Sequence, residues 1–308
     1  MENMSPSEIA ILNNSLSQLN YLMSEVSGNA SGTPPAGTPT PAELTNILSN
    51  ALNAPGTTSI VQTDTNPPAV QIQGMLNPIQ SLDSYIMLLA ALCVYNEHPS
   101  PYDISMPSDA TAFVSALAKW RYYAITNTSS DNILYSNMPW ESITQHSFSK
   151  NMTSADLHSD FLAELFGTFA LPEYVMGQLD GILTSVFAQL KSLSLSFESQ
   201  NQTLDHFLTY YYFDKQQDPN MQTYYSPQIR TFYLQIDQQT WEASNQKSSA
   251  SDFNFNMVYC QMDSGLNIFP VAEYDELSTC IQLICGQSPE EISAMVDLQL
   301  VMPQQQYI

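Results

Sequence analysis

The fold class is decided by Ile229-Arg-Thr-Phe-Tyr-Leu-Gln-Ile236 and Phe253-Asn-Phe-Asn-Met-Val-Tyr-Cys260, two stretches in which successive residues alternate in character. A period of two is typical of β-strands, because successive side chains point to opposite faces. We therefore predict that the two stretches pair as a late β-ribbon. The loop between them, Gln238–Asp252, is much longer than a hairpin turn, and loops of that size more often serve a function than short ones.

Most of the chain before this ribbon has apolar residues three and four positions apart, which is the spacing of amphipathic helices. The clearest case is Pro6–Val26, where Ser5 and Glu8 form a capping box. We predict further helices at 41 onward, 81–95, 108–126, 153–171, 173–198, 271–285 and 288–300, a helix or strand at 202–212, a loop with short strands at 59–73, and an irregular stretch at 127–151. The fold class is α+β, a predominantly helical body with a late antiparallel β-ribbon.

Composition divides the chain into three parts. Residues 1–27 form an N-terminal helix, and residues 28–41 form a linker rich in Gly, Pro and Thr, in which nothing apolar can pack. Residues 42–308 form the main α+β domain. The first helix is therefore either a mobile arm or a helix that docks independently of its neighbour in sequence.

The chain is acidic and carries few charges. Thirty acids and seven bases give a formal net charge of −23, and only 12% of the residues are charged, compared with about 25% in a typical soluble domain. Nucleic-acid binding needs clustered cations that displace counterions from phosphates, and seven bases spread from Lys119 to Lys247 do not provide them. Nucleic acid is excluded as a partner and anionic lipid is disfavoured, whereas contact with neutral lipid remains open.

The sequence lacks the motifs of the common catalytic classes. It contains no Gly-x-Ser-x-Gly, no phosphate-binding loop and no Gly-x-Gly-x-x-Gly, so we expect no serine-hydrolase or nucleotide chemistry. The histidines lack zinc-protease spacing, and we expect four free, buried cysteines: Cys93, Cys260, Cys280 and Cys285. We predict no catalytic residue, no metal site and no nucleotide. A Cys–His nucleophile pair that uses Cys260 or Cys93 stays an alternative.

No segment has the pattern of a secretory signal or of a membrane-spanning helix. The longest nearly apolar run, Tyr85–Tyr95, is shorter than the roughly 20 residues that a spanning helix needs. The long apolar stripe of Glu173–Glu198 is typical of a core helix, or of a helix that moves toward a membrane. In the second case, the membrane-contact candidates are Leu179, Ile182, Leu183, Val186 and Leu190.

Four stretches between about Asp160 and Cys285 resemble the Evf type of bacterial virulence factor, an insecticidal protein family. They are Leu183-Thr-Ser-Val-Phe-Ala-Gln-Leu-Lys-Ser-Leu193, Leu204-Asp-His-Phe-Leu-Thr-Tyr-Tyr-Tyr-Phe213, Ile229–Ile236 followed by Lys247-Ser-Ser, and Phe253–Tyr259. The resemblance covers under half of the chain and rests on order and composition, without a catalytic motif. It implies a non-enzymatic α/β protein of insect-associated bacteria that acts in the host gut and carries a fatty acyl group on a buried cysteine. Cys260 is the acyl candidate by its position in the chain.

The function expected from these observations is that of a non-enzymatic bacterial toxin or virulence factor, acting on insect gut cells through membrane or lipid contact. The expected partners are a host membrane or a host-cell receptor, together with a second toxin component. We expect this toxin to be pore-forming and secreted, and to be released from the producing cell without a recognisable signal peptide. If it is not released, we expect it in the cytoplasm. The alternatives are a structural or assembly protein, such as a viral or phage particle component, and an acid-dependent hydrolase.

Overall fold

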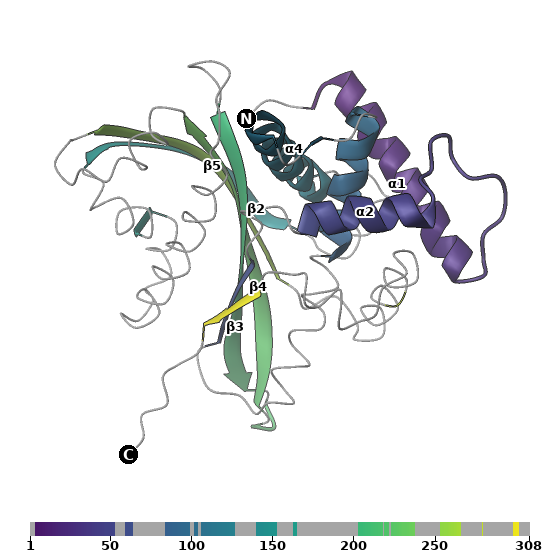
Figure 1. Cartoon of the computed structure of the whole chain (residues 1–308). Coiled ribbons are helices and arrows are strands. Elements are labelled where there is room, and N and C mark those ends of the chain that lie inside the picture. Colours follow the sequence, from purple (N-terminus) through teal and green to yellow (C-terminus); the bar gives the residue numbers. More distant parts are fainter. Residues whose placement is uncertain are drawn as a thin grey trace.

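Helices on one side and a sheet on the other make up the computed structural model (Figure 1). It describes residues 4–52, 59–63, 84–98, 102–103, 106–126, 140–152, 163–164, 203–217, 219–221, 223–237, 253–265, 279 and 298–301. The helices are α1 (Pro6–Val26), α2 (Pro41–Leu52), α4 (Pro107–Thr126) and a further helix at 84–97. Both halves of the α+β class are therefore present, and helices hold most of the side chains that the structure describes.

The sheet has six strands in the order β2-β5-β4-β3-β1-β6. The strands are β1 (Ser59–Thr63), β2 (Trp140–Met152), β3 (Thr203–Gln217), β4 (Thr223–Asp237), β5 (Phe253–Gly265) and β6 (Leu298–Val301). β2, β5, β4 and β3 pair antiparallel, whereas β1 lies parallel to both β3 and β6. The long β3–β4 pair forms the middle of the sheet.

The two alternating stretches form β4 and β5, which lie side by side and antiparallel, with Ile236 opposite Met257 and Ile229 opposite Ser264. They are interior strands of a wider sheet, not a separate ribbon, because β3 adds to the free edge of β4 and β2 to that of β5. The segment that fitted helix or strand, 202–212, is strand β3. The short strand expected within 59–73 is β1.

Two expectations for the sheet edges were wrong. The stretch 127–151 was expected to be irregular, but its second half belongs to β2. β2 pairs with β5 alone, and an edge strand needs no apolar face as regular as that of a central strand, so its polar sequence hid it. The end of the helix expected at 288–300 belongs to β6, since pairing with β1 overrides the local pattern there.

α1 begins and ends as its sequence predicts. Ser5 accepts a hydrogen bond from the backbone N–H of Glu8, and the Glu8 carboxylate accepts one from the backbone N–H of Ser5, which completes the capping box. At the other end Gly28 has a φ of 72°, a conformation open to glycine, and Asn29 donates its N–H to the Ser24 carbonyl. The predicted bounds of α1 are confirmed.

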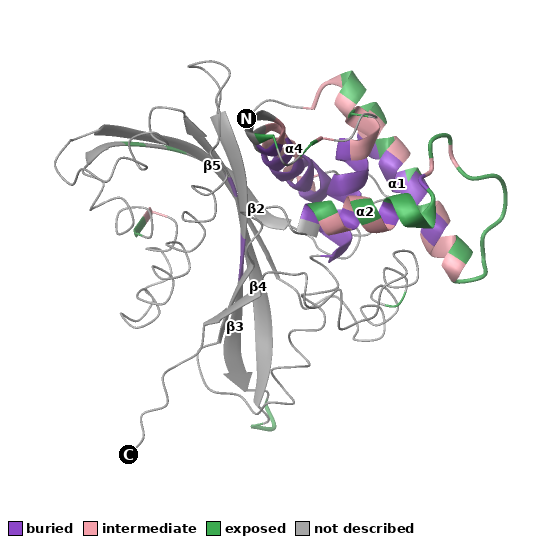
Figure 2. Cartoon of the chain, in the orientation of Figure 1, coloured by how far each residue is buried: buried purple, intermediate pink, exposed green. Residues whose placement is uncertain are grey.

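The helix at 84–97 is the centre of the apolar core (Figure 2). Every residue from 84 to 94 is at most 4% exposed, so the helix is covered on all its faces. α1 adds Leu12, Leu16, Leu19 and Leu22 to the same cluster, and α2 and α4 complete it. The N-terminal helix therefore shares a core with helices of the main domain, while the boundary at 28–41 stays a prediction.

α4 joins this helical layer to the sheet. The ring of Tyr122 stacks on that of Tyr233 in β4, with centroids 4.9 Å apart and an interplanar angle of 19°. Next to this contact, Thr209 and Tyr210 of β3 are both buried, although neighbouring strand residues point to opposite faces. The sheet is therefore covered on both faces at this point, and the helices cover one of them.

Candidate functional site

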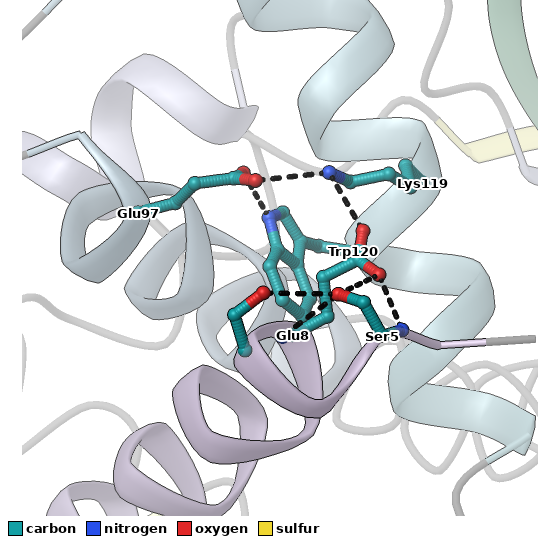
Figure 3. A network of polar contacts seen from close by, with 6 residues as sticks. Ser5, Glu8, Glu97, Lys119 and Trp120 are labelled. Atoms are coloured by element: carbon teal, nitrogen blue, oxygen red, sulfur yellow. Dashed lines mark hydrogen bonds and ion pairs between the residues drawn. The ribbon is translucent and has the colours of Figure 1, made fainter.

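A polar cluster centred on Lys119 joins three helices (Figure 3). The Lys119 ammonium on α4 lies 3.4 Å from a carboxylate oxygen of Glu8 on α1 and 3.0 Å from one of Glu97 in the helix at 84–97. The same ammonium lies 5.1 Å from the ring centroid of Trp120, near enough for a cation–π contact. One cation thus pairs with two carboxylates that come from different parts of the chain.

Glu8 divides its two carboxylate oxygens between its own cap and Lys119. Oε2 accepts hydrogen bonds from the Ser5 N–H and hydroxyl, both at 2.8 Å, and Oε1 faces Lys119. Partial burial acts to raise the pKa of Glu8, but the hydrogen bonds from Ser5 and the charge of Lys119 outweigh it and lower the pKa below its ordinary value. Glu8 is therefore held in its ionised form.

Glu97 is bound by two donors, both on α4. The Trp120 indole N–H donates to Oε2 at 2.6 Å, and Lys119 donates to Oε1 at 3.0 Å. Trp120 itself is fully buried, so this bond gives its N–H the partner that a buried indole requires. The carboxylate of Glu97 thus fixes the position of α4 against the helix at 84–97.

A second polar cluster lies between α1 and the helix at 84–97. The Asn96 amide donates to the hydroxyl of Ser15 and to the side-chain carbonyl of Gln18, both at 2.9 Å. The Gln18 amide donates in turn to the backbone carbonyl of Ala36 in the linker at 3.1 Å. Gly37 follows with a φ of 73°, and this turn brings the linker back over α1. Ser15 and Gln18 are completely buried, so these bonds are essential to α1 docking.

Cys93 lies beneath this second cluster. It is a free cysteine with no exposed surface, and Ser15 lies within hydrogen-bonding reach of its thiol. Burial raises the pKa of Cys93 to about 12, so the thiol stays protonated and is a poor nucleophile. The expectation of a free, buried cysteine is confirmed at this position.

Two further aromatic side chains lie near the clusters. Burial, followed by the nearby charges of Glu97 and Asp109, raises the pKa of Tyr102 to about 12. The His98 ring packs against the Tyr102 ring with centroids 5.0 Å apart. No group of three or more metal-ligating side chains occurs among the described residues. The contacts of the two polar clusters are suited to holding helices together.

Of the predicted site residues, the structure describes only the position of Cys260. Cys260 is in β5, opposite Gln145 of β2 and Tyr233 of β4, whereas the Lys119 cluster joins three helices. The five membrane-contact candidates of the helix expected at 173–198 lie outside the described residues.

The sequence did contain one signal of the polar clusters. Ser15 and Gln18 interrupt the leucine stripe of α1, since they lie three or four positions from Leu12, Leu19 and Leu22. A polar residue on a face that becomes buried requires a hydrogen-bond partner. That partner, Asn96, was not identifiable because it is about eighty residues away in sequence.

Comparisons with known proteins give a weak structural likeness. No protein-family model and no curated protein sequence matches this chain. One similar solved structure carries the description "Structure of the Evf virulence factor"; the match covers 86% of this chain and 98% of that one, with 13% identity and a TM-score of 0.41. The neighbour is a virulence factor, but at this TM-score and identity the likeness supports no statement about the activity of this chain.

The described helices were also compared with the requirements of a bilayer span. None in the described part of the chain is both long enough and apolar enough to cross a membrane.

Proposed function

We propose that this protein is a non-enzymatic bacterial virulence factor that acts on host cells through contact with neutral lipid. The observation that carries the lipid part is the helix at 84–97, which is apolar around its whole circumference from Tyr85 to Val94. The virulence part rests on the sequence resemblance of the stretches between Asp160 and Cys285 to the Evf type.

The length of this helix defines the kind of contact. The described part of this helix, residues 84–97, extends about 21 Å, whereas the hydrocarbon core of a bilayer is about 30 Å thick. Such a helix matches one leaflet or the interface, not a full span. The proposal is therefore that the protein inserts partway into a lipid surface.

The polar groups support a non-enzymatic role. Glu8 and Glu97 are each paired with Lys119. The Cys93 thiol is buried, and its pKa is raised to about 12. Groups that are committed to holding helices are not available to transfer protons or attack a substrate. The overall acidity directs the contact to neutral lipid, because a net charge of −23 opposes approach to anionic headgroups.

The remaining parts of the proposal concern partners and modification. The host partner is a membrane or a membrane receptor, a second toxin component acts with the protein, and the protein is released from the producing cell. A fatty acyl group on Cys260 would form by acyl transfer from an activated thioester, with the thiol proton of Cys260 leaving on the released carrier thiol. The mass of the intact protein tests this step, because an unmodified mass removes the acyl group from the proposal.

Flotation with phosphatidylcholine vesicles that contain a photoactivatable acyl chain tests the lipid contact. We expect the protein to float and the peptide that covers 84–97 to carry lipid adducts. Vesicles with a large fraction of phosphatidylserine should bind less protein, because the charges repel. A protein that stays at the bottom of the gradient and instead assembles into regular particles would be a structural component, and the proposal would be wrong.

A further inference from the structure

We propose that α1 is a removable cover over the apolar helix at 84–97, and that lipid takes its place. The inference rests on the proposed function and adds the step by which the buried helix becomes accessible. It is drawn from the contacts of α1, which divide into an apolar set that lipid can replace and a polar set that it cannot.

The apolar set consists of four leucines on one face of α1. Leu12, Leu16, Leu19 and Leu22 are at most 6% exposed and belong to the same cluster as the helix at 84–97. Acyl chains are about as apolar as leucine side chains. If both helices exchange these contacts for lipid contacts, the free energy of the protein and bilayer together therefore changes little. In the presence of a bilayer, the leucines alone do not keep α1 docked.

The polar set is what lipid does not replace. Leaving the docked position breaks the bonds of Asn96 to Ser15 and Gln18 and separates Glu8 from Lys119. A buried polar group without a partner is costly in hydrocarbon. On the described helix at 84–97, Asn96 and the Cys93 thiol both lose a contact with α1, and both lie near its C-terminal end, where its polar residues would remain in the interface.

The connection to the rest of the chain permits the movement. Residues 27–40 link α1 to α2, and most of them are exposed. Fully extended, they would span about 46–50 Å, which exceeds the length of α1 itself. Ser27, Gly28 and Asn29 bond to the C-terminal end of α1 as its cap, and these bonds can move with the helix. Farther along the linker, the Ala36 carbonyl accepts a hydrogen bond from Gln18, which breaks together with the Asn96 contacts. α1 can therefore leave without unfolding α2.

The charges around Lys119 show that mild acid is not the trigger. Lys119 faces Glu8 from α1 and Glu97 from the helix at 84–97, and the Glu97 charge also acts on Cys93 and Tyr102. The pKa of Glu8 is lowered, so its pair with Lys119 persists at pH 5 and above. The cover is released by competition with lipid in this pH range.

A disulfide that locks the cover tests the inference. Ser15 lies within hydrogen-bonding reach of the Cys93 thiol, so the variant Ser15→Cys places a second thiol against it. We expect the oxidised variant not to float with phosphatidylcholine vesicles and the same variant to float after reduction. The control is Ser15→Cys combined with Cys93→Ala, which should float after the same oxidation.

The outcomes separate the two proposals. If the oxidised and reduced variants float equally, the inference that α1 is a removable cover is wrong, and the proposed lipid contact stands. If neither the variants nor the native protein float, the proposed lipid contact is wrong, and hydrogen exchange then tests whether α1 can leave its docked position.

In the variant Asn96→Ala, the amides of α1 should exchange about tenfold faster, while those of β3 and β4 are unchanged. Equal acceleration in both regions means global unfolding and overturns the cover; Asn20→Ala, at an exposed position of α1, is the control.

Discussion

The helical layer and the sheet are held together by different kinds of contact. β3 and β4 pair along their whole lengths, from Thr203 opposite Asp237 to Gln217 opposite Thr223. The hydrogen bonds between them come from backbone N–H and C=O groups, which nearly every residue type supplies. In the helical layer, one ammonium and one amide join helices that are distant in sequence. The sheet should therefore tolerate substitution better than the helical layer, whose assembly depends on individual side chains.

The largest expected effect is in the apolar part of the helical layer. Leu19→Ala removes a side chain with no exposed surface, and the cavity should lower the free energy of unfolding by about 2–5 kcal/mol. Ile9→Ala on the same helix is the control, because Ile9 is 43% exposed and should cost less than about 1 kcal/mol. Denaturant unfolding measures both. Equal losses would mean that α1 is not docked as described.

The next effect isolates one hydrogen bond. Trp120→Phe keeps most of the ring but removes the donor to Glu97, and we expect a loss of about 1.5–3 kcal/mol, since the bond is to a charged group. Replacing Glu97 by Gln should reduce the penalty of a subsequent Trp120→Phe change. A double-mutant cycle measures this coupling, and additive losses would contradict the bond.

A smaller effect depends on pH. The pKa of Glu8 is lowered in the folded protein, so its stabilisation is fully present above the unfolded value of about 4.5 and is lost as the pH falls through the folded value. The melting temperature of Glu8→Gln should therefore lie below that of the native protein at pH 6, by an amount equivalent to less than about 1 kcal/mol. The two melting temperatures should converge as the pH falls through the lowered pKa of Glu8. Asn13→Ala, at an exposed position of α1, is the control and should leave the pH dependence of the melting temperature unchanged.

The smallest effect concerns the turn between β3 and β4. Met221 has a φ of 62° and is 73% exposed, so it combines a left-handed backbone with a side chain that packs little. Met221→Gly relieves the steric cost but adds chain entropy to the unfolded state, and we expect a gain of about 0.5 kcal/mol, visible as a slightly higher denaturation midpoint. A loss above 1 kcal/mol would show that the Met221 side chain has a packing role.

The elements that were predictable are those whose signals are local. The capping boxes of Ser5 with Glu8 and of Thr40 with Glu43 are both present, and each depends on residues three apart. The period-two segments of β4 and β5 are also local patterns. In contrast, β2 and β6 lie at the two edges of the sheet, where the partner strand decides the conformation.

The polar clusters could not be predicted for a different reason. Glu8 was identifiable as a cap, but nothing in its neighbourhood indicates that Lys119 lies 3.4 Å away. The positions of Glu97 and Lys119 are set by the packing of helices around Tyr85–Val94, and a tertiary arrangement of that kind has no periodic signature in one sequence.

The distance in sequence between α1 and its partners has a consequence for synthesis. Because α1 binds Asn96 and Lys119, it remains without a docking site until the chain has grown past both residues. At about 5–20 residues per second, the stretch from Glu8 to Lys119 takes roughly 6–22 s to make. For most of that interval the leucine face of α1 also lacks the helix at 84–97, the centre of its apolar cluster, so much of this face stays open to a chaperone or to the ribosome surface.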